Sequence, residues 1–387
     1  MTEKLAVLFL MDDFAGPAGG TEQHMLFLQR ALPRDAFDLH FALVTRFRGM
    51  RADDFPVRPV VLSEGGPRGP RGTMYRFRRL VSLIRSVRAD VIHAFCRRSE
   101  LLAILASRWA GRGAVLGVRR NIGYWHTWHS LWRARMVAAL SAQYVANCDA
   151  ARQFATKMEW IPPQRICVIR NPAPTGRLET GLANTAPRSA LGIVNGENVV
   201  GMVANVRPIK DHTTFLHSAR LVLGSHPRTR FVVVGGGEDA YVSQMKTLAR
   251  ELGIESRVSW LGPLPNPLAV VPRFDVAVLS SRSEALSNAL LEYAAAGIAT
   301  VATDVGGTAE VVQEGSTGFL VPQQSPELMA QRIGLLLSDA DLRARFGHEA
   351  RIRAQTAFHE AVVLDQYAQC YHHVAHRTGK PLAAAIQ

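Results

Sequence analysis

Two glutamates, Glu284 and Glu292, have the type and spacing that could bind a polar ligand, within the run SRSEALSNALLEYAAAGIATVATDVGG. The preceding run DVAVLSS is typical of a strand, and the residues from about Ser287 to Ala296 are typical of a helix that Gly297 ends. Glu284 would then lie on the loop before the helix, and Glu292 about one and a half turns further along. Carboxylates accept hydrogen bonds from hydroxyl groups, and the amides at a helix start attract anions. The pair therefore predicts a ligand with hydroxyls and phosphates, although two glutamates on one helical segment also occur on ordinary surfaces.

A second set of candidate residues is cationic and lies in the segment VANVRPIKDH, residues 203–212. Arg207 and Lys210 follow directly after a predicted strand. Arginine offers a planar fork of donors and lysine a compact charge, so two such cations on one loop suit a diphosphate. A basic loop that is simply solvated is the alternative interpretation.

Two adjacent glycines, Gly19 and Gly20, separate the first predicted strand, LAVLFL, from a helix predicted from about Thr21 to Leu32. Glycine lets a ligand approach the backbone, and the helix start again favours an anion. The spacing is not G-x-G-x-x-G, and the second strand, FDLHFALVTRF, does not end in an acid for a ribose, which weakens a dinucleotide-binding interpretation. A plain turn between strand and helix remains the alternative.

The elements that must position these residues alternate between apolar strands and helices over most of the 387 residues. This alternation predicts an α/β protein with two Rossmann-like, doubly wound domains that face each other across a cleft. Ligands of such sheets bind at the carboxyl ends of the strands. The expected domains are 1–175 and 199–360, joined by a linker region at 176–198 and followed by a terminal segment, 361–387.

The composition limits where the protein works. No apolar run reaches the ~18 residues of a transmembrane helix, and MTEKLAVLFLMDD is typical of a first strand and not of a signal peptide. The cysteines at positions 96, 148, 167 and 370 are scattered without a CxxC pair. We therefore expect a cytoplasmic protein with reduced thiols.

The run with the two glutamates resembles the retaining GT-B glycosyltransferases of the GT4-like, group 1 family. In that family the run is approximately E-G-x-x-x-x-x-L-E-A-M-A-x-G-x-P-V-V-A-T-x-x-G-G. The Gly-Gly turn and the Arg and Lys of the basic loop also match the family in position, and the resemblance is strongest over 199–322. The chain departs from the pattern mildly, at Ala285, Tyr293, Ala294, Ile298 and Ala299.

The resemblance implies a fold and a reaction. The second domain would bind a nucleotide-diphosphate sugar, the first would bind the acceptor, and the C-terminal helix, 361–387, would pack back on the first domain. Transfer would retain the anomeric configuration, with no metal and no cofactor. The implied catalytic residues are Arg207, Lys210 and Glu284, and the implied donor-binding residues are Gly19, Gly20, Leu286, Ser287, Asn288 and Glu292.

The first domain departs from the family at its histidines. His93 in DVIHAF is similar to a family histidine, but Phe95 stands where many relatives have a second one. Relatives also often place a histidine after the next strand, where this chain has VRRNIG. The resemblance implies that Arg119, Arg120 or Asn121 replaces that histidine in contacting phosphate or acceptor.

Residues 68–135 hold fifteen arginines against one Asp and one Glu, a local excess that equals the net charge of +13 of the whole chain. A helix over 74–88 would place Phe77, Leu80, Val81 and Ile84 on one face, with tryptophans following at 125, 128 and 132. We expect this segment to attach to an anionic membrane surface, peripherally at its inner face. A lipid-linked or growing cell-surface glycan would then be the acceptor. The alternative is that the apolar face is core and the arginines are solvated.

Other functions remain open at this point. A UDP-sugar epimerase shares the fold and the donor site, and the arginine-rich segment leaves open a protein that binds or glycosylates nucleic acid, although no nucleic-acid partner is expected. Asp339 and Asp341 form a DxD pattern, but their context predicts a helix start with Ser338 as the cap and not a metal site.

Overall fold

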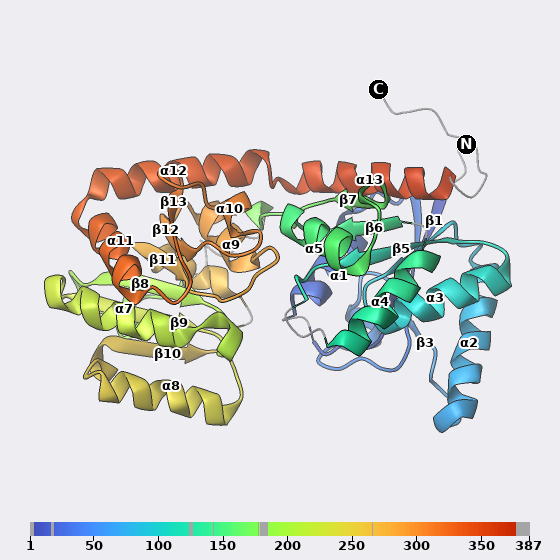
Figure 1. Cartoon of the computed structure of the whole chain (residues 1–387), viewed down its shortest axis with the longest axis horizontal. Helices are drawn as coiled ribbons and strands as arrows, with labels where there is room; N and C mark the ends of the chain where they lie inside the picture. The colour runs from blue at the N-terminus through green and yellow to red at the C-terminus, as the bar shows by residue number, and fades with distance from the viewer. Residues whose placement is uncertain are drawn as a thin grey trace. The chain divides into compact units, whose positions relative to one another are not determined.

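The computed structural model describes residues 4–16, 19–123, 127–141, 143–176, 178, 185–264 and 266–376. It divides into two compact units (Figure 1). Unit 1 comprises Met1–Arg170 and Val363–Gln387, and unit 2 comprises Asn171–Val362. The divisions fall close to the expected domain ends at 175 and 360. Within the expected linker, residues 177 and 179–184 lie outside the described part of the chain.

Unit 1 is built on a seven-stranded parallel sheet in the order β3-β2-β1-β4-β5-β6-β7. Parallel strands are covered on both faces and are therefore nearly continuously apolar, as the fully buried β1 shows. The strands are β1 (Leu5–Met11), β2 (Phe37–Leu43), β3 (Pro59–Val61), β4 (Val91–Ala94), β5 (Ala114–Arg119), β6 (Gln143–Ala146) and β7 (Ile166–Val168).

The helices of unit 1 cover both faces of this sheet. One core cluster joins α1 and α13 to one face, and a second joins α2 and α3 to the other. Helix α4 contacts α3 on one side and α5 on the other. The helices are α1 (Gly20–Ala31), α2 (Gly69–Ser86), α3 (Arg97–Ala110), α4 (Trp128–Leu140), α5 (Asp149–Glu159) and α13 (Glu360–His376).

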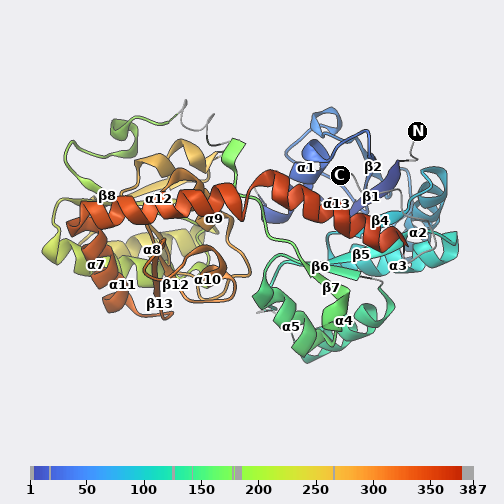
Figure 2. The ribbon, with the colours of Figure 1, turned by 90° about the horizontal axis from the view of Figure 1, so that it is seen from above.

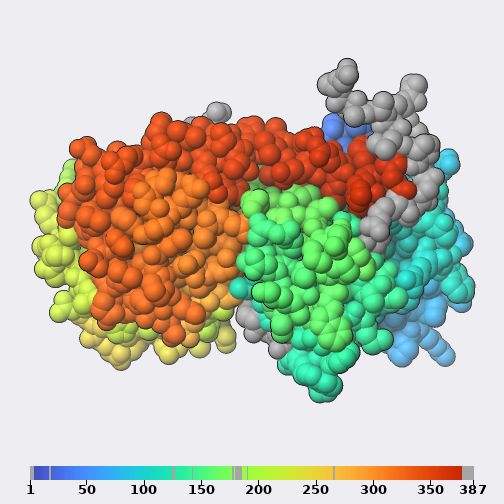
Figure 3. Space-filling view, turned by 45° about the horizontal axis from the view of Figure 1, so that its top comes forward, coloured from blue at the N-terminus to red at the C-terminus, as the bar shows by residue number. Residues whose placement is uncertain are grey.

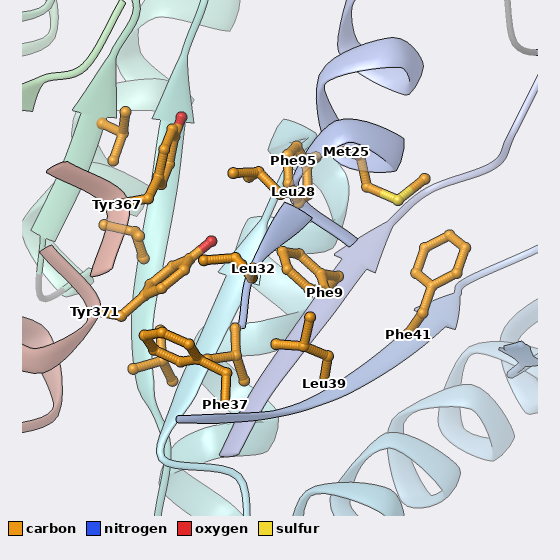
Figure 4. Packing of buried hydrophobic residues seen from close by; sticks show 14 of the residues in the cluster. Phe9, Met25, Leu28, Leu32, Phe37, Leu39, Phe41, Phe95, Tyr367 and Tyr371 are labelled. Carbon is orange, nitrogen blue, oxygen red and sulfur yellow. The ribbon is translucent and has the colours of Figure 1, made fainter. Parts of the chain in front are cut away.

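Helix α13 is the C-terminal helix that was expected to return to the first domain, and it does so. Its residues Val363, Tyr367 and Tyr371 belong to the core cluster of β1, β2 and α1. Figure 2 shows the helix lying over this sheet, and Figure 4 shows the ring of Tyr371 beside Phe37, with Tyr367 further along the same helix.

Unit 2 repeats the architecture with a six-stranded parallel sheet in the order β10-β9-β8-β11-β12-β13. The strand order reverses between β8 and β11, and such a reversal is where doubly wound sheets bind ligands. The strands are β8 (Asn198–Val203), β9 (Thr229–Val234), β10 (Val258–Gly262), β11 (Val276–Leu279), β12 (Thr300–Thr303) and β13 (Gly318–Val321). The helices are α7 (His212–Ser225), α8 (Asp239–Glu251), α9 (Asn288–Ala296), α10 (Thr308–Val311), α11 (Pro326–Ser338) and α12 (Ala340–Thr356).

The apolar face of α2 corrects one expectation from the sequence. Leu80, Val81 and Ile84 are 0%, 6% and 0% exposed and pack in the core against the sheet, with Phe77 partly buried beside them. This face was expected to attach to a membrane, and that expectation was wrong, because the sheet of unit 1 already covers it. The arginines of α2 flank a helix whose apolar side belongs to the protein interior.

Candidate functional site

Two loops of unit 2 meet at the carboxyl ends of β8 and β11. The first contains a short 3-10 helix, Pro208–Lys210, and the second leads from β11 into α9. The hydroxyl of Ser280 donates to the backbone carbonyls of Lys210 at 3.1 Å and Asp211 at 2.9 Å. In return, the amide of Arg282 donates to the carbonyl of Ile209 at 2.9 Å. These bonds fix one loop against the other.

The facing loops bring two predicted site residues into direct contact. The ammonium of Lys210 forms an ion pair with Oε1 of Glu284, which also accepts a hydrogen bond from the hydroxyl of Ser281 at 2.7 Å. The side chains are 23% and 10% exposed, so solvent screens this pair less than an ordinary surface pair. Arg207, the third predicted catalytic residue, precedes the 3-10 helix with its side chain exposed to solvent.

A second ion pair, not predicted from the sequence, supports the same loops. Asp211 lies in the left-handed conformation, with φ of 50°, and its side chain caps α7 by accepting from the backbone amide of Thr214 at 3.5 Å. The same carboxylate also accepts from the hydroxyl of Thr214 at 2.8 Å. Arg282 forms an ion pair with the same carboxylate at 3.2 Å. An aspartate directly before an apolar helix is a capping signal, so this role could have been found in the sequence.

Helix α9 starts beside these loops. Ser287 is its N-cap and Asn288 its first residue, so the free amides of the first turn lie where the sequence placed them. The side-chain oxygen of Asn288 accepts from the amide nitrogen of Asn171 at 2.8 Å, a contact that the sequence did not predict. Leu286 is buried. Glu292 lies four residues after Asn288, about one turn further along α9, and is 7% exposed.

Tyr293, one of the departures from the family pattern, has a structural role. Its hydroxyl accepts from the amide of Val203 at 2.6 Å and donates to the carbonyl of Val278 at 3.4 Å. The tyrosine thus fastens α9 to the ends of β8 and β11. Burial, opposed by the bond to Val203, raises the pKa of this phenol, so it stays a neutral donor.

A glycine-rich loop after β9 approaches the basic loop closely. Gly235 has φ of +151°, and a Cβ there would lie 2.0 Å from the carbonyl oxygen of Ala204. A Cβ on Gly237 would lie 2.2 Å from the carbonyl oxygen of Val206. Only glycine permits this backbone contact, which supports the strand end that leads to Arg207.

The predicted glycine pair lies in unit 1. Gly19 is the N-cap of α1 and Gly20 its first residue. The Glu22 carboxylate lies directly over this turn. A Cβ at Gly19 would be only 2.0 Å from Oε2 of Glu22. Arg120 donates to the carbonyl of Gly20 at 3.4 Å. A carboxylate and a guanidinium therefore both lie at this helix start.

The structure distinguishes Arg119 from Arg120, two of the three candidates for the position of the missing histidine. Arg119 is 4% exposed and bonded to Glu100 at 2.9 Å and Glu159 at 2.6 Å, with its guanidinium over the ring of Tyr144. Burial lowers its pKa, but the two carboxylates outweigh burial, and the net pKa is raised. Arg119 is thus a buried residue whose ion pairs lie in the protein interior. Arg120 instead contacts the turn at Gly20.

His93 is also an interior residue. Its Nδ1 is hydrogen-bonded to the hydroxyl of Tyr371 on α13 at 2.8 Å, and its ring stacks on Phe95 with centroids 4.1 Å apart. Burial, helped by the charge of Arg120, lowers its pKa to about 3. His93 is therefore neutral and fixed against α13.

The DxD pattern is a helix start, as expected, but its cap is Asp339 and not Ser338. The Asp339 carboxylate accepts from the amide of Leu342 at 2.8 Å, because α12 begins at Ala340 and α11 continues through Ser338. Across the described part of the chain, no group of three His, Cys, Asp or Glu side chains could hold a metal ion.

Two protein-family descriptions match the chain, one to each half. "Glycosyl transferases group 1" matches residues 184–353, which include both loops and α9. "Glycosyltransferase Family 4" matches residues 18–177. The chain belongs to the group 1 glycosyltransferases.

Individual relatives of this chain are similar to it over part of their length. A D-inositol 3-phosphate glycosyltransferase of Corynebacterium efficiens is 31% identical over 217 residues, 54% of this chain and 51% of the relative. One of the same name from Nocardia farcinica is 31% identical over 224 residues, 56% of this chain and 49% of the relative. The matches thus span about half the length of these curated relatives.

Solved structures show that the fold is GT-B, as expected. Anabaena HepE in complex with UDP superposes with a TM-score of 0.82 at 20% identity, covering 95% of this chain and 99% of that one. WaaG, a glycosyltransferase involved in lipopolysaccharide biosynthesis, superposes with a TM-score of 0.72 at 15% identity, covering 94% and 99%. At these identities the likeness concerns the fold alone.

Proposed function

We propose that this protein transfers a sugar from a nucleotide-diphosphate donor to an acceptor with retention of the anomeric configuration. The observation that carries the proposal is the contact between Lys210 and Glu284 at the carboxyl ends of β8 and β11, beside the start of α9. This contact places a cation that suits phosphate beside a carboxylate that suits sugar hydroxyls. Both lie where the strand order of the sheet reverses.

The leaving group is the nucleoside diphosphate. As the bond between the sugar C1 and the phosphate oxygen breaks, negative charge develops on that oxygen, and Arg207 and Lys210 stabilise it electrostatically. The acceptor oxygen bonds to C1 on the same face, and its proton passes to the departing phosphate oxygen. Glu284 holds sugar hydroxyls and Glu292 the ribose, so the protein needs no covalent nucleophile and no metal.

The acceptor is a lipid-linked or growing cell-surface glycan, and the enzyme works in the cytoplasm at the inner face of the membrane. HepE has been solved with UDP-glucose, and several similar proteins are named D-inositol 3-phosphate glycosyltransferases. These names suggest where a screen should begin. Uridine nucleotide sugars come first among donors, and an inositol phosphate belongs in the acceptor panel.

A thermal-shift screen of nucleotide sugars tests the donor, because a ligand present at 100 times its Kd adds about 2.7 kcal/mol of stability. The donor found is then incubated with candidate acceptors, with and without EDTA. Acceptor-dependent release of the nucleoside diphosphate, unchanged by EDTA, supports the proposal. Isomerised donor without acceptor indicates an epimerase, and a product of inverted anomeric configuration overturns retention.

A further inference from the structure

Helix α4 of unit 1 buries small residues and exposes large apolar ones, the reverse of an ordinary surface helix. Ala134 and Ala138 are its buried residues. The large apolar residues exposed along the helix recur every four positions, which places them on one side. They are Trp128, Trp132, Met136 and Leu140, at 69%, 39%, 70% and 40% exposed.

The end of α5 extends this side. Trp160, directly after α5, is 59% exposed and meets the ring of Trp132 with centroids 5.5 Å apart. Trp109, near the end of α3, is 70% exposed. We call Trp128, Trp132, Met136, Leu140 and Trp160 the tryptophan surface. Figure 3 shows α4 and α5, which carry these residues, at the surface of unit 1 (green).

Trp160 is held outward at a conformational cost. Its φ is 58°, in the left-handed region that glycine favours and that a bulky residue rarely adopts. The guanidinium of Arg135 lies over its ring at 3.8 Å and donates to the carbonyl of Met158 at 2.9 Å. The end of α5 thus exposes a tryptophan at a backbone conformation that glycine would adopt at a lower energetic cost.

The charges around the tryptophan surface have one sign. Arg108, Arg133 and Lys157 are exposed on α3, α4 and α5, and α4 has no acid. The carboxylates of α2 to α5 are few, and each is already paired with an arginine. Glu100 and Glu159 are buried against Arg119, and Asp149 pairs with Arg152 and Arg170.

A pocket of about 310 Å³ lies next to Trp109, between α2 and α3. Phe77 and Val81 form its apolar side, and Arg78 and Arg85 line it as well. Arg85 donates to the backbone carbonyl of Trp109 at 2.8 Å, which ties the end of α3 to α2.

We propose that the tryptophan surface docks unit 1 on an anionic lipid bilayer. Tryptophan rings prefer the boundary between headgroups and acyl chains, and exposed Arg and Lys attract anionic headgroups. A second copy of the chain fits poorly, because a symmetric contact would bring arginines against arginines. No helix in the described part of the chain is long and apolar enough to cross a membrane, so this contact is peripheral. The proposal concerns where the enzyme works and does not depend on its donor.

Vesicle sedimentation of the full chain tests the proposal. Vesicles of phosphatidylcholine alone are compared with an equal mixture of phosphatidylcholine and phosphatidylglycerol, at low and high salt. We expect binding to the anionic vesicles only, weakening as salt rises. Intrinsic tryptophan fluorescence should shift to shorter wavelength on binding and be quenched by lipids brominated along their acyl chains, because the rings enter the bilayer.

Matched variants separate this surface from general effects. Trp128→Gln with Met136→Gln should lower vesicle affinity at least tenfold, whereas Leu221→Gln, at a 46% exposed leucine of α7, should leave it unchanged. Arg108→Glu with Arg133→Glu should lower affinity by ~100-fold or more, since each charge near an anionic leaflet contributes about 1 kcal/mol. Arg220→Glu, at an exposed arginine of α7, is the control and should leave vesicle affinity nearly unchanged. Nucleotide binding, measured by calorimetry, should be the same in all variants.

Three outcomes overturn the proposal. Equal sedimentation with both vesicle types, or none with either, excludes an anionic bilayer as the partner. A concentration-dependent dimer that the Trp128 and Met136 changes abolish identifies a second copy as the occupant. Tighter binding to duplex DNA or RNA than to anionic vesicles identifies a nucleic acid. Each can occur while donor binding persists, so failure here is distinct from failure of the proposed reaction.

Discussion

The ammonium of Lys210 and the carboxylate of Glu284 form a largely buried ion pair that joins the loop after β8 to the loop after β11. Each side chain is therefore held in place before any ligand binds. Ser281 donates to the same carboxylate oxygen and restricts it further. A cation positioned in advance costs little reorganisation when charge develops on a leaving phosphate.

Changing Lys210 to Ala should lower turnover at saturating donor by roughly 10²–10³, the range for loss of one charge-stabilising donor. The circular dichroism spectrum should be unchanged, because the loop remains tied by backbone bonds. Lys246→Ala, at an exposed lysine of α8, is the control and should retain full activity. Arg207→Lys should also lose activity, because an ammonium does not reproduce a planar fork. Normal turnover by Lys210→Ala would contradict the assigned role.

Substitutions of the two glutamates should affect different quantities, nucleotide affinity for Glu292 and transfer rate for Glu284. Glu292→Gln should weaken binding of the nucleoside diphosphate, because the ribose contact persists in that product. Glu284→Ala should lower the rate while leaving affinity for the nucleoside diphosphate nearly unchanged, because that ligand has no sugar. Calorimetry with the diphosphate decides between them, and equal losses of affinity in both variants would show that the division of roles is wrong.

Substitutions of Arg119 and Arg120 should have different effects on stability and on transfer rate, although the two residues are adjacent. Arg119→Met leaves Glu100 and Glu159 buried without their shared partner, and breaking a buried pair in this way costs about 3–5 kcal/mol of unfolding free energy. Arg120→Ala should instead lower the transfer rate with a smaller loss of stability. Urea unfolding and single-turnover rates of both variants test this. The reverse ranking in stability would contradict the structural role of Arg119.

Stability should fall in acid partly because of His93. Its folded pKa is about 3, whereas the unfolded value is near 6.5, so between these pH values only the unfolded chain takes up the proton. The free energy of unfolding then decreases as pH falls from about 6.5, by up to ~1.4 kcal/mol per pH unit. His93→Phe should reduce this slope between about pH 4 and 6.

Tyr371→Phe is the matched control for this pH dependence. It removes the hydrogen bond to Nδ1 of His93 but keeps the titrating ring. It should lower the unfolding free energy by about 1–3 kcal/mol, the cost of an unpaired buried polar group, without flattening the slope. A wild-type slope in His93→Phe would show that other groups dominate the acid transition.

Much of the fold was predictable because its signals are local. A strand buried on both faces requires a continuous apolar run, and the loops after such strands are where the family's residues stand. Lys210, Glu284 and the start of α9 were therefore placed correctly on their elements. Helix α5 was not predicted, although its amphipathic pattern, with Ala151 and Ala155 buried on one face, is present in the sequence.

Other features depend on which element covers a given residue. The apolar face of α2 and the tryptophans of α4 lie in the one segment that was expected to attach to a membrane, yet the sheet covers Leu80 and Ile84 while Trp128 and Met136 stay exposed. Arg119 and Arg120 are neighbours on the chain, but the end of a strand sends successive side chains to opposite faces, so one meets Glu100 and the other the Gly20 turn. His93 became a neutral interior residue only because α13, from the far end of the chain, packs against it.

The sequence by itself determined the alternation of strands and helices apart from α5, the two-domain class and the loops that hold the candidate site. Those properties follow from hydrophobic period and residue type within short segments. The tertiary structure alone decided the partner of each polar group and the surface left uncovered. Burial and electrostatic pairing depend on residues distant in sequence, and no local pattern encodes which of them will meet.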